Sequence, residues 1–522
     1  MSITIPTVIY LADLNIATSA GVATTLRYST NKTVTAGGNV YTAKIAQPAF
    51  MGQSISIDNV IGGAISSSLG ELLLTNTKRD LDYLKDYIFE GKTLTIYSYN
   101  TSTLVLTTIL TQTIEQASFE WDKVSIRLQN KSDLLDKPLQ TKKYLGNNVL
   151  PDGVEGVSDL LDKYKPLLFG RVANITPTLV NTDKLIFQIS SEPVQQVVSV
   201  MSNGAYVSVS SNIIATYADF VSDVAGKVPN AGYFTTYSGA EGSFIRVGME
   251  SGQLTCTAWE KTSVIYDSPA QVILRILTLA GYTSANYVAA DFTAIDALVA
   301  DNVGIYVTEG QTITEILNQI CSSIGVWWGF DATNKFRMYY FGIAASPLLS
   351  IHASTSTDPY GITSFDIATA SFNNRSIPVK EVKISYDKNW TVQAKNVLAG
   401  IIVTNYPDRT TWLGEAYRKV SSVSSSTLAL YPESQLLEYE TLLNSETAAK
   451  SEADRVLALT SVKRSIITLS ARMSLAELSS LYICSTISIV LPRYGFTSGT
   501  SFILIGMEID YLNFTANLTL WG

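Results

Sequence analysis

FEWDKVSIRL (residues 119–128) and YLNFTANLTL (residues 511–520) carry the same pattern of apolar residues in the first and the last quarter of a 522-residue chain. Toward the end of both stretches apolar and polar residues alternate, as in a half-buried β-strand. The echo predicts two related β-units in one chain. The matching residues are Phe119, Val124, Ile126 and Leu128 in the first and Tyr511, Ala516, Leu518 and Leu520 in the second.

A repeated β-unit would give the chain a function based on symmetry. A trimer of such chains presents six copies of the unit, and six copies can form a ring that matches six-fold neighbours. Alternating strands of unrelated β-structure also produce such echoes by chance. The echo alone therefore suggests a repeat but does not favour it over unrelated strands, and it needs support from other features.

Length and composition predict several folded, β-rich domains. A chain of 522 residues is too long for one core, and a prior of about 150 residues per domain suggests roughly three or four. Hydrophobic residues make up 46% of the chain and 28 residues are tyrosines, which suits β-sheets and is too hydrophobic for disorder. We expect the chain to be folded throughout.

The charge balance argues against tight binding to nucleic acid. The chain has 37 Lys and Arg against 45 Asp and Glu, a net charge of −8, and no Lys/Arg-rich run. High-affinity contact with a phosphate backbone is therefore not expected. A negative surface would let nucleic acid pass without sticking, although solubility alone explains the charge equally well.

The three cysteines, Cys256, Cys321 and Cys484, are odd in number and widely spaced. This spacing indicates neither a disulfide framework nor a CxxC metal site, and we expect small buried apolar residues. Met1 to Tyr10 lacks the basic and apolar regions of a signal peptide, and no apolar run of 18 residues occurs. Synthesis in a cytoplasm and no membrane span are predicted.

Turn and strand patterns divide the chain into four predicted domains. Residues 1–145 read as strands with one short helix, Arg79 to Phe89, stopped at Gly91, which favours a β-barrel or sandwich. Residues 146–266 read as an inserted β-rich domain ending near Tyr266. The segment between Lys131 and Asn374 is expected to separate the two related halves.

Residues 267–345 predict a small α/β module, with helices from Pro269 and from the capping box Thr312-Ile313-Thr314-Glu315 and a hairpin between Trp327 and Phe341. Residues 346–522 predict a loop from His352 to Arg375, further strands, and a helix from Ser445 to Leu459. The predicted class is mainly β with α+β parts.

Few residues suit catalysis. The single histidine, His352, is expected in a polar loop without partners, which excludes most imidazole-based sites. Glu115, Glu120 and Asp122 cluster before a strand and could form a carboxylate pair for glycan cleavage, although carboxylates at strand ends are usually solvated. No phosphate-binding GxxxxGK[ST] motif occurs.

Two further patterns have a structural and a functional interpretation. Asp331 and Asn334 could suggest a calcium loop, but Asp-Ala-Thr-Asn-Lys offers too few oxygen ligands, so a hairpin turn is favoured. Aromatic residues beside this turn could stack sugars or bases, but a core role is favoured. They are Trp327, Trp328, Phe330, Tyr339, Tyr340 and Phe341. No catalytic, cofactor-binding or metal-binding residue is predicted, and no cofactor.

KPLLFGRVANITP (residues 165–177) and six shorter segments, spread over most of the chain, together resemble the tail-tip and baseplate hub proteins of tailed bacteriophages. The first of them, residues 165–177, is similar to the "KP...wGrv.nv.P" segment of that family. Each motif is built from common residues, and their order and spacing carry the resemblance. The others are LLLTN (72–76), LDYL (81–84), FEGK (89–92), SIVLPRYG (488–495), FILIG (502–506) and LTLW (518–521).

The resemblance implies a homotrimer in which two tube-like β-barrel domains per chain, separated by the inserted domain and the α/β module, build a pseudo-six-fold ring. The implied partners are the distal tail protein or tail tube ring, the central fibre or spike, and the tape measure protein, with DNA passing through the channel without specific binding. The implied location is the virion, at the tail tip or baseplate. Some relatives hold an iron-sulfur cluster near the C-terminus, but Cys484 alone cannot supply its ligands.

Two other functions stay open from the sequence. A tail-associated cell-wall hydrolase would use Glu115 or Glu120, and a glycan-binding receptor module would use Trp327, Trp328 and Tyr339. A structural, non-enzymatic hub is favoured because no segment is left to house a hydrolase domain and no catalytic constellation stands out.

Overall fold

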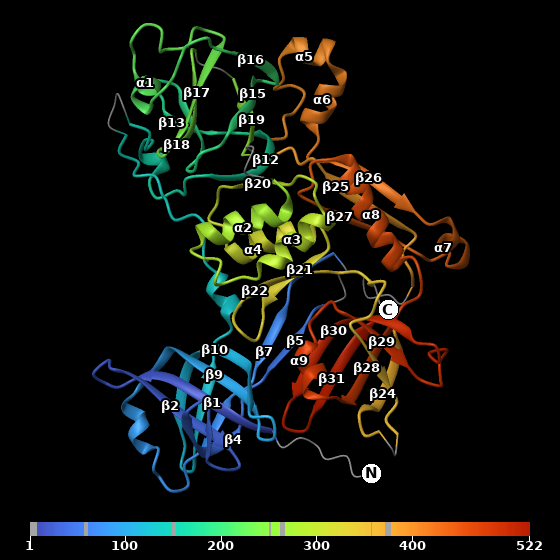
Figure 1. The fold of residues 1–522 in the computed structure, drawn as a ribbon. Helices are drawn as coiled ribbons and strands as arrows, with labels where there is room; N and C mark the ends of the chain where they lie inside the picture. The colour runs from blue at the N-terminus through green and yellow to red at the C-terminus, as the bar shows by residue number, and fades with distance from the viewer. Residues whose placement is uncertain are drawn as a thin grey trace.

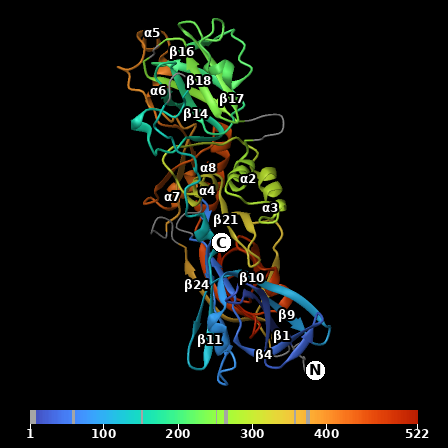
Figure 2. The same cartoon turned by 90° about the vertical axis from the view of Figure 1, so that its left-hand side faces the viewer.

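The computed structural model of this protein describes residues 8–56, 61–148, 153–249, 252–260, 267–355, 358–370 and 377–522. Tyr266 and Arg375, which mark predicted boundaries, lie outside these ranges. The molecule is elongated: two β-units lie side by side at one end, a helical module lies in the middle, and a β-rich unit forms the other end (Figures 1 and 2).

The N-terminal part forms a closed seven-stranded barrel in the order β2-β1-β9-β10-β11-β8-β4, closed by parallel pairing of β4 with β2. Alternate residues such as Leu14, Leu94 and Ile126 fill its interior. The predicted helix from Arg79 to Phe89 is shorter, a five-residue 3-10 turn. The elements are β1 Val8–Ala17, β2 Ala23–Thr30, β3 Val34–Ala36, β4 Asn39–Gln47, β8 Leu72–Thr75, η1 Asp82–Asp86, β9 Ile88–Asn100, β10 Val105–Phe119 and β11 Lys123–Leu128.

The C-terminal part forms a half-barrel in the order β23-β29-β30-β31-β28-β24. In the described residues its two ends meet at one parallel bridge, between Ala353, just after β23, and Ile362 of β24. A hairpin from the N-terminal part, β5–β7, extends this sheet by pairing β5 with β30. The elements are β5 Met51–Ser54, β7 Ser66–Leu69, β23 Leu349–His352, β24 Gly361–Thr369, β28 Ser465–Arg472, α9 Leu475–Ser480, β29 Thr486–Val490, β30 Thr500–Asp510 and β31 Thr515–Trp521.

The β-rich unit at the far end is one nine-stranded sheet in the order β13-β14-β18-β17-β16-β15-β19-β12-β20. Strand β12 pairs with β20 at its start and with β19 further along, so it ties this sheet to the helical module. The elements are β12 Leu167–Ile175, β13 Thr178–Asn181, β14 Ile186–Ser190, β15 Gln196–Ser202, β16 Ala205–Val209, α1 Tyr217–Val221, β17 Tyr233–Gly239, β18 Gly242–Val247, β19 Leu254–Trp259 and β20 Gly304–Val307.

The middle module has the helices and the hairpin that the sequence predicts. Pro269 occupies the first turn of α2, and α4 begins with the predicted capping box, in which Thr312 and Glu315 cap each other's backbone N–H at 2.8 and 3.2 Å. Strand β6 from the N-terminal part pairs with the hairpin. The elements are β6 Gly63–Ala64, η2 Lys131–Leu135, α2 Pro269–Leu279, α3 Ala289–Leu298, α4 Ile313–Ser322, β21 Val326–Phe330 and β22 Phe336–Tyr340, while η3 Ser158–Leu160 packs with the nine-stranded unit.

Residues 377–464 form a further sheet, β26-β25-β27, covered by α8. In α8 the buried Glu452 accepts two hydrogen bonds from Arg455, at 2.6 and 2.7 Å. Helices α5 and α6 instead pack against the nine-stranded sheet through Leu398, Ile402 and Leu413. The elements are β25 Glu381–Tyr386, α5 Gly400–Asn405, α6 Pro407–Gly414, β26 Arg418–Val423, α7 Ser425–Leu430, β27 Leu436–Glu440 and α8 Glu446–Thr460.

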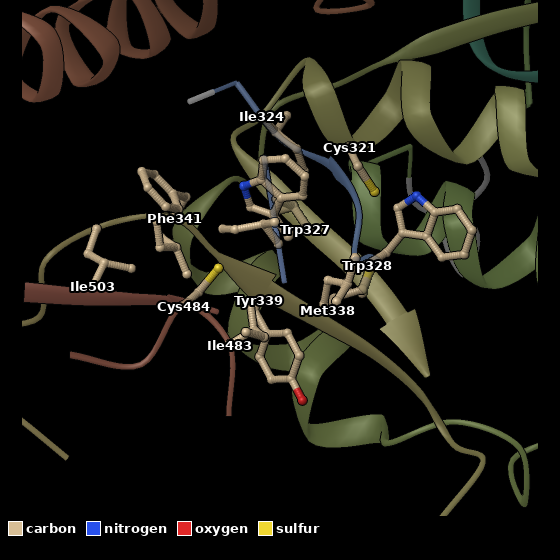
Figure 3. Packing of buried hydrophobic residues seen from close by; sticks show 14 of the residues in the cluster. Cys321, Ile324, Trp327, Trp328, Met338, Tyr339, Phe341, Ile483, Cys484 and Ile503 are labelled. Atoms are coloured by element: carbon tan, nitrogen blue, oxygen red, sulfur yellow. The ribbon is translucent and has the colours of Figure 1, made fainter. Parts of the chain in front are cut away.

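One large core joins the middle module to the C-terminal half-barrel. Cys321, Trp327 and Trp328 of the module belong to the same buried cluster as Cys484 and Ile503 of the half-barrel (Figure 3). The predicted class, mainly β with α+β parts, is confirmed. The division at 145, 266 and 345 stays a prediction, because shared sheets and shared cores cross these limits.

We expect Trp328→Ala to lower the free energy of unfolding by about 3–5 kcal/mol, the usual cost of removing a fully buried aromatic side chain. Trp328 is 0% exposed, stacks on Phe336, and donates its indole N–H to Asn318 at 2.8 Å. Denaturant unfolding followed by tryptophan fluorescence and circular dichroism measures the effect.

Trp121→Ala is the matched control. Trp121 is 81% exposed and contacts the guanidinium of Arg79, 4.4 Å from the ring centroid, an exposed contact worth about 0.5–1 kcal/mol. Equal losses in the two variants would contradict the position of Trp328 in the core.

Candidate functional site

The carboxylates that the sequence singles out are held by basic residues on the β10–β11 hairpin. Arg127 donates to both oxygens of Glu115 at 2.8 Å, and Lys123 lies 3.3 Å from Glu120. The hydrogen bonds from Arg127 lower the pKa of Glu115. The general acid of a glycosidase needs a raised pKa, so the lowered pKa of Glu115 is the opposite of what that role requires. Asp122 lies in the turn of the hairpin, where its carbonyl accepts from the N–H of Asn76 at 2.7 Å.

The remaining candidates for chemistry lie apart. The prediction that His352 sits in a loop is wrong: it ends strand β23, opposite Val490, because the apolar residues before it pair with β29. Cys256, Cys321 and Cys484 are buried, and burial raises the pKa of each thiol. In the described ranges no three His, Cys, Asp or Glu side chains gather as metal ligands, and no helix there is long and apolar enough to span a membrane.

The aromatic residues beside the hairpin fill the core. Trp327, Trp328 and Phe330 are at most 5% exposed, and Tyr339 stacks on Tyr482 of the half-barrel. Figure 3 shows Trp327 and Tyr339 among buried neighbours. The core interpretation of these residues is therefore confirmed, and they offer no exposed face for stacking a sugar or a base.

The Asp331–Asn334 segment is a turn, as predicted. Asp331 Oδ1 accepts from the backbone N–H groups of Thr333 and Lys335, at 2.8 and 3.1 Å, and Asn334 has a φ of 63°. The turn contacts the N-terminal barrel, because the N–H of Thr111 donates to the carbonyl of Ala332 at 2.7 Å. The turn therefore forms a contact between the middle module and the N-terminal barrel.

The echo in the sequence corresponds to two equivalent hairpins. In β10–β11, Ala117 lies opposite Ile126 and Ile114 opposite Leu128. In β30–β31, Met507 lies opposite Leu518 and Leu504 opposite Leu520. A β-bulge falls at the same place in both, after the Ile114–Leu128 pair and after the Leu504–Leu520 pair. A shared bulge is a specific feature that chance alternation does not supply.

The structure corrects one member of the echo. Phe119 lies opposite Val124, but Ala516 lies opposite Ile509 and not opposite Tyr511. Four residues separate Phe119 from Val124, whereas six residues separate Ile509 from Ala516, and the outer two of these six, Asp510 and Thr515, form one more pair. Phe119 therefore corresponds to Ile509, and the longer turn frees Tyr511 for another contact.

The equivalence extends beyond the hairpins. The N-terminal unit runs β8, η1, β9, β10, β11 with the sheet order β9-β10-β11-β8, and the C-terminal unit runs β28, α9, β29, β30, β31 with the order β29-β30-β31-β28. Gly91, two residues before the first pair of β9 with β10, has a φ of 71°, and Cys484, two residues before the first pair of β29 with β30, has a φ of 67°. A repeated left-handed residue indicates the same local backbone path.

The two units differ in the strands that complete them. Strand β1 pairs antiparallel with β9, whereas β23 pairs parallel with β29. The first unit closes on itself through β2 and β4, and the second takes β5 from the first. The repeat therefore covers four strands and one short helix, and not the whole of each unit.

The strand β5, which the second unit takes from the first, makes the contact between the two units. Gln53 and Ser54 of β5 pair with Met507 and Gly506 of β30, and the N–H of Ile55 donates to the carbonyl of Ile505 at 2.8 Å. The hydroxyl of Tyr10 donates to the carbonyl of Tyr511 at 2.7 Å. The ring of Phe50 contacts those of Tyr10 and Tyr511, and together with the directional main-chain pairing of β5 these contacts hold the two units at a fixed angle.

The outward faces of the repeated strands are polar. On the half-barrel they line a groove of about 540 Å³ beside β5 and β7. Its charged side chains are the acids Asp366 and Glu508. On the barrel the corresponding face carries Gln116, Ser118 and the Glu115–Arg127 pair. Further groove residues are Ser364, Thr468, Ser470, Asn517 and Thr519.

No family model and no curated protein matches this chain. Among solved structures, it is similar to a tail protein from Neisseria meningitidis MC58, with a TM-score of 0.41 and 9% identity over 98% of this chain and 96% of that chain. It is similar to a chain of the virion of a native gene transfer agent particle, with a TM-score of 0.43 and 12% identity over 69% of this chain and 84% of that chain.

A third similar structure is the 43 kDa tail protein of prophage MuSo2 from Shewanella oneidensis, with a TM-score of 0.38 and 9% identity over 94% of this chain and 97% of that chain. Two of these three are named as tail proteins.

We expect Gly91→Ala to lower the stability of the N-terminal barrel by about 1 kcal/mol, because an L-residue is strained at positive φ although no atom lies within 4 Å of the new Cβ. The midpoint of thermal unfolding, followed by circular dichroism, measures the loss.

Gly400→Ala is the control, since Gly400 also has open space but begins helix α5 without a positive φ. This change is expected to be neutral or slightly stabilising. A Gly91→Ala midpoint at or above the wild-type value would contradict the left-handed conformation on which the equivalence with Cys484 partly rests.

Proposed function

We propose that this chain is a structural, non-enzymatic hub of a phage tail tip or baseplate, in which a homotrimer forms a pseudo-six-fold ring. The observation that carries the proposal is the repeat of strand, short helix and three strands in two units, with the same sheet order and the same bulge. Three chains with two such units each supply six similar lobes. Such a ring matches both three-fold and six-fold neighbours.

The fixed contact between the two units supports a ring. Units joined head to tail, with different surfaces in contact, close into a ring when the rotation between them is right. Pairing of β5 with β30 fixes that rotation within the chain. The contact between one chain and the next would repeat it.

The polar strand faces suit the lining of a channel for DNA. The groove on the half-barrel carries carboxylates and small hydroxyl and amide side chains, and on the barrel Arg127 is neutralised by Glu115. Binding to a phosphate backbone requires uncompensated Lys and Arg. These faces would let DNA pass without holding it.

The parts outside the repeat would hold neighbouring tail proteins. The nine-stranded sheet with α5 and α6 lies at the end of the molecule away from the two repeated units (Figure 1). We assign the ring a position between the tail tube or distal tail ring and the central fibre or spike, with the tape measure protein inside. This assignment rests on the sequence resemblance and places the chain in the virion.

The mass of the purified chain in solution tests the ring. We expect a particle of three times the 56.8 kDa chain mass by light scattering or native mass spectrometry. The proposed pseudo-six-fold ring requires a closed trimer, and a stable monomer or dimer at high concentration would contradict it.

Peptidoglycan zymography separates the hub from the rival hydrolase. We expect no clearing by the wild-type chain or by Glu115→Gln and Glu120→Gln variants, because Arg127 lowers the pKa of Glu115 and leaves it a poor proton donor. Clearing by the wild type that is lost in either variant would overturn the structural assignment.

A further inference from the structure

Part of strand β10 has no partner on one of its sides. From Val105 to Thr113 it pairs with β9, and from Ile114 to Phe119 it pairs with β11 on the opposite side. Beyond Thr113 no strand in the described part of the chain pairs with the β9 side. Glu115, Gln116, Ser118 and Phe119 are exposed. We name residues Glu115–Phe119 on this side the β10 edge.

The hydrogen-bond pattern identifies the free groups of the β10 edge. The N–H of Glu120 donates to the carbonyl of Lys123 at 2.9 Å, so this pair is a hydrogen-bonded pair. Antiparallel pairs alternate between hydrogen-bonded and non-hydrogen-bonded. Ser118 and Gln116 therefore direct their backbone groups toward β11, and Ala117 and Phe119 direct theirs outward.

The repeat shows what such an edge accepts. Ala117 corresponds to Met507, since Ala117 lies opposite Ile126 and Met507 opposite Leu518. In β30 this outward side is filled: Met507 pairs with Gln53 of β5, and the carbonyl of Ile505 accepts from Ile55. The same position is paired in one unit and open in the other.

The β10 edge also lacks the features that normally protect an exposed strand. Edges are usually guarded by proline, lysine, inward charges or a covering loop. The sequence here is Glu-Gln-Ala-Ser-Phe, and its one charge, Glu115, is bound by Arg127 of β11. The side chain of Phe119 is 38% exposed at the end of the edge. An unguarded edge with free N–H and C=O groups is suited to strand addition.

We propose that the β10 edge is the contact between chains of the ring: it accepts a strand from a second copy of this protein, in the register in which β30 accepts β5. The inference rests on the proposed trimer and adds the residues that join it. In the chain, the donor β5–β7 lies between β4 and β8 of the first unit. The equivalent position in the second unit, between β24 and β28, holds residues 377–464, and the expected donor is an edge strand of their sheet β26-β25-β27.

Ala117→Pro tests the contact. Proline removes the outward N–H of Ala117 and places its ring where the added strand would lie, while edge strands tolerate proline when the lost N–H faces solvent. Ala117→Ser keeps the N–H and is the matched control. We expect the wild type and Ala117→Ser to have the trimer mass and Ala117→Pro to have the monomer mass, with the circular dichroism spectrum of the wild type.

Amide hydrogen exchange on the wild-type trimer gives a second measurement that does not depend on the fold of a variant. The amides of Ala117 and Phe119 are expected to be protected like that of Met507 in the paired strand β30. A trimeric Ala117→Pro variant, or rapid exchange at Ala117 and Phe119 in the wild-type trimer, would overturn the edge contact and leave the ring standing. A monomeric wild type would overturn the ring and the edge contact together.

Discussion

The pairing of β5 with β30 is the constraint on which the arrangement of the molecule depends. It places a hairpin from the first part of the chain in the sheet of the last part, and the bond from Tyr10 to the carbonyl of Tyr511 lies at the same junction. Main-chain pairing is directional, so the two units cannot rotate against each other without breaking it. Because the angle between the two repeated units is fixed in this way, it can set the geometry of an assembly. Two units joined by a flexible linker would have no fixed angle.

The rest of the fold reinforces this junction. Strand β6 of the N-terminal part enters the sheet of the middle module, and the turn at Ala332 of that module bonds back to Thr111 of the barrel. The module shares its core with the half-barrel through Trp327, Tyr339 and Cys484. The residues that could take part in catalysis lie in this core or in surface ion pairs. What the molecule presents to a partner is the fixed arrangement of its units and their polar strand faces. These are the properties that the proposed channel-lining adaptor would need.

Local patterns predicted much of the fold but not how its parts combine. Helices α2 and α4 follow from Pro269 and the Thr312–Glu315 capping box, and the echo identified the equivalent second strands of the two hairpins. The transfer of β5 to β30 has no local signal, since its partners are separated by most of the chain. The echo also matched Tyr511 with Phe119 wrongly, because the connection between the equivalent strand positions is two residues longer in the second hairpin. The equivalence of Gly91 and Cys484 was not visible in the sequence, because Cys484 adopts the left-handed conformation in which glycine is usual.

The central claim is that two repeated units per chain form six lobes around one axis, and a view of the purified particle down that axis tests it most directly. Class averages from electron microscopy should show a three-fold particle with six inner lobes around an open or plugged centre, and with three outer arms from the inserted parts. Three inner lobes, or a particle without three-fold symmetry, would contradict the account.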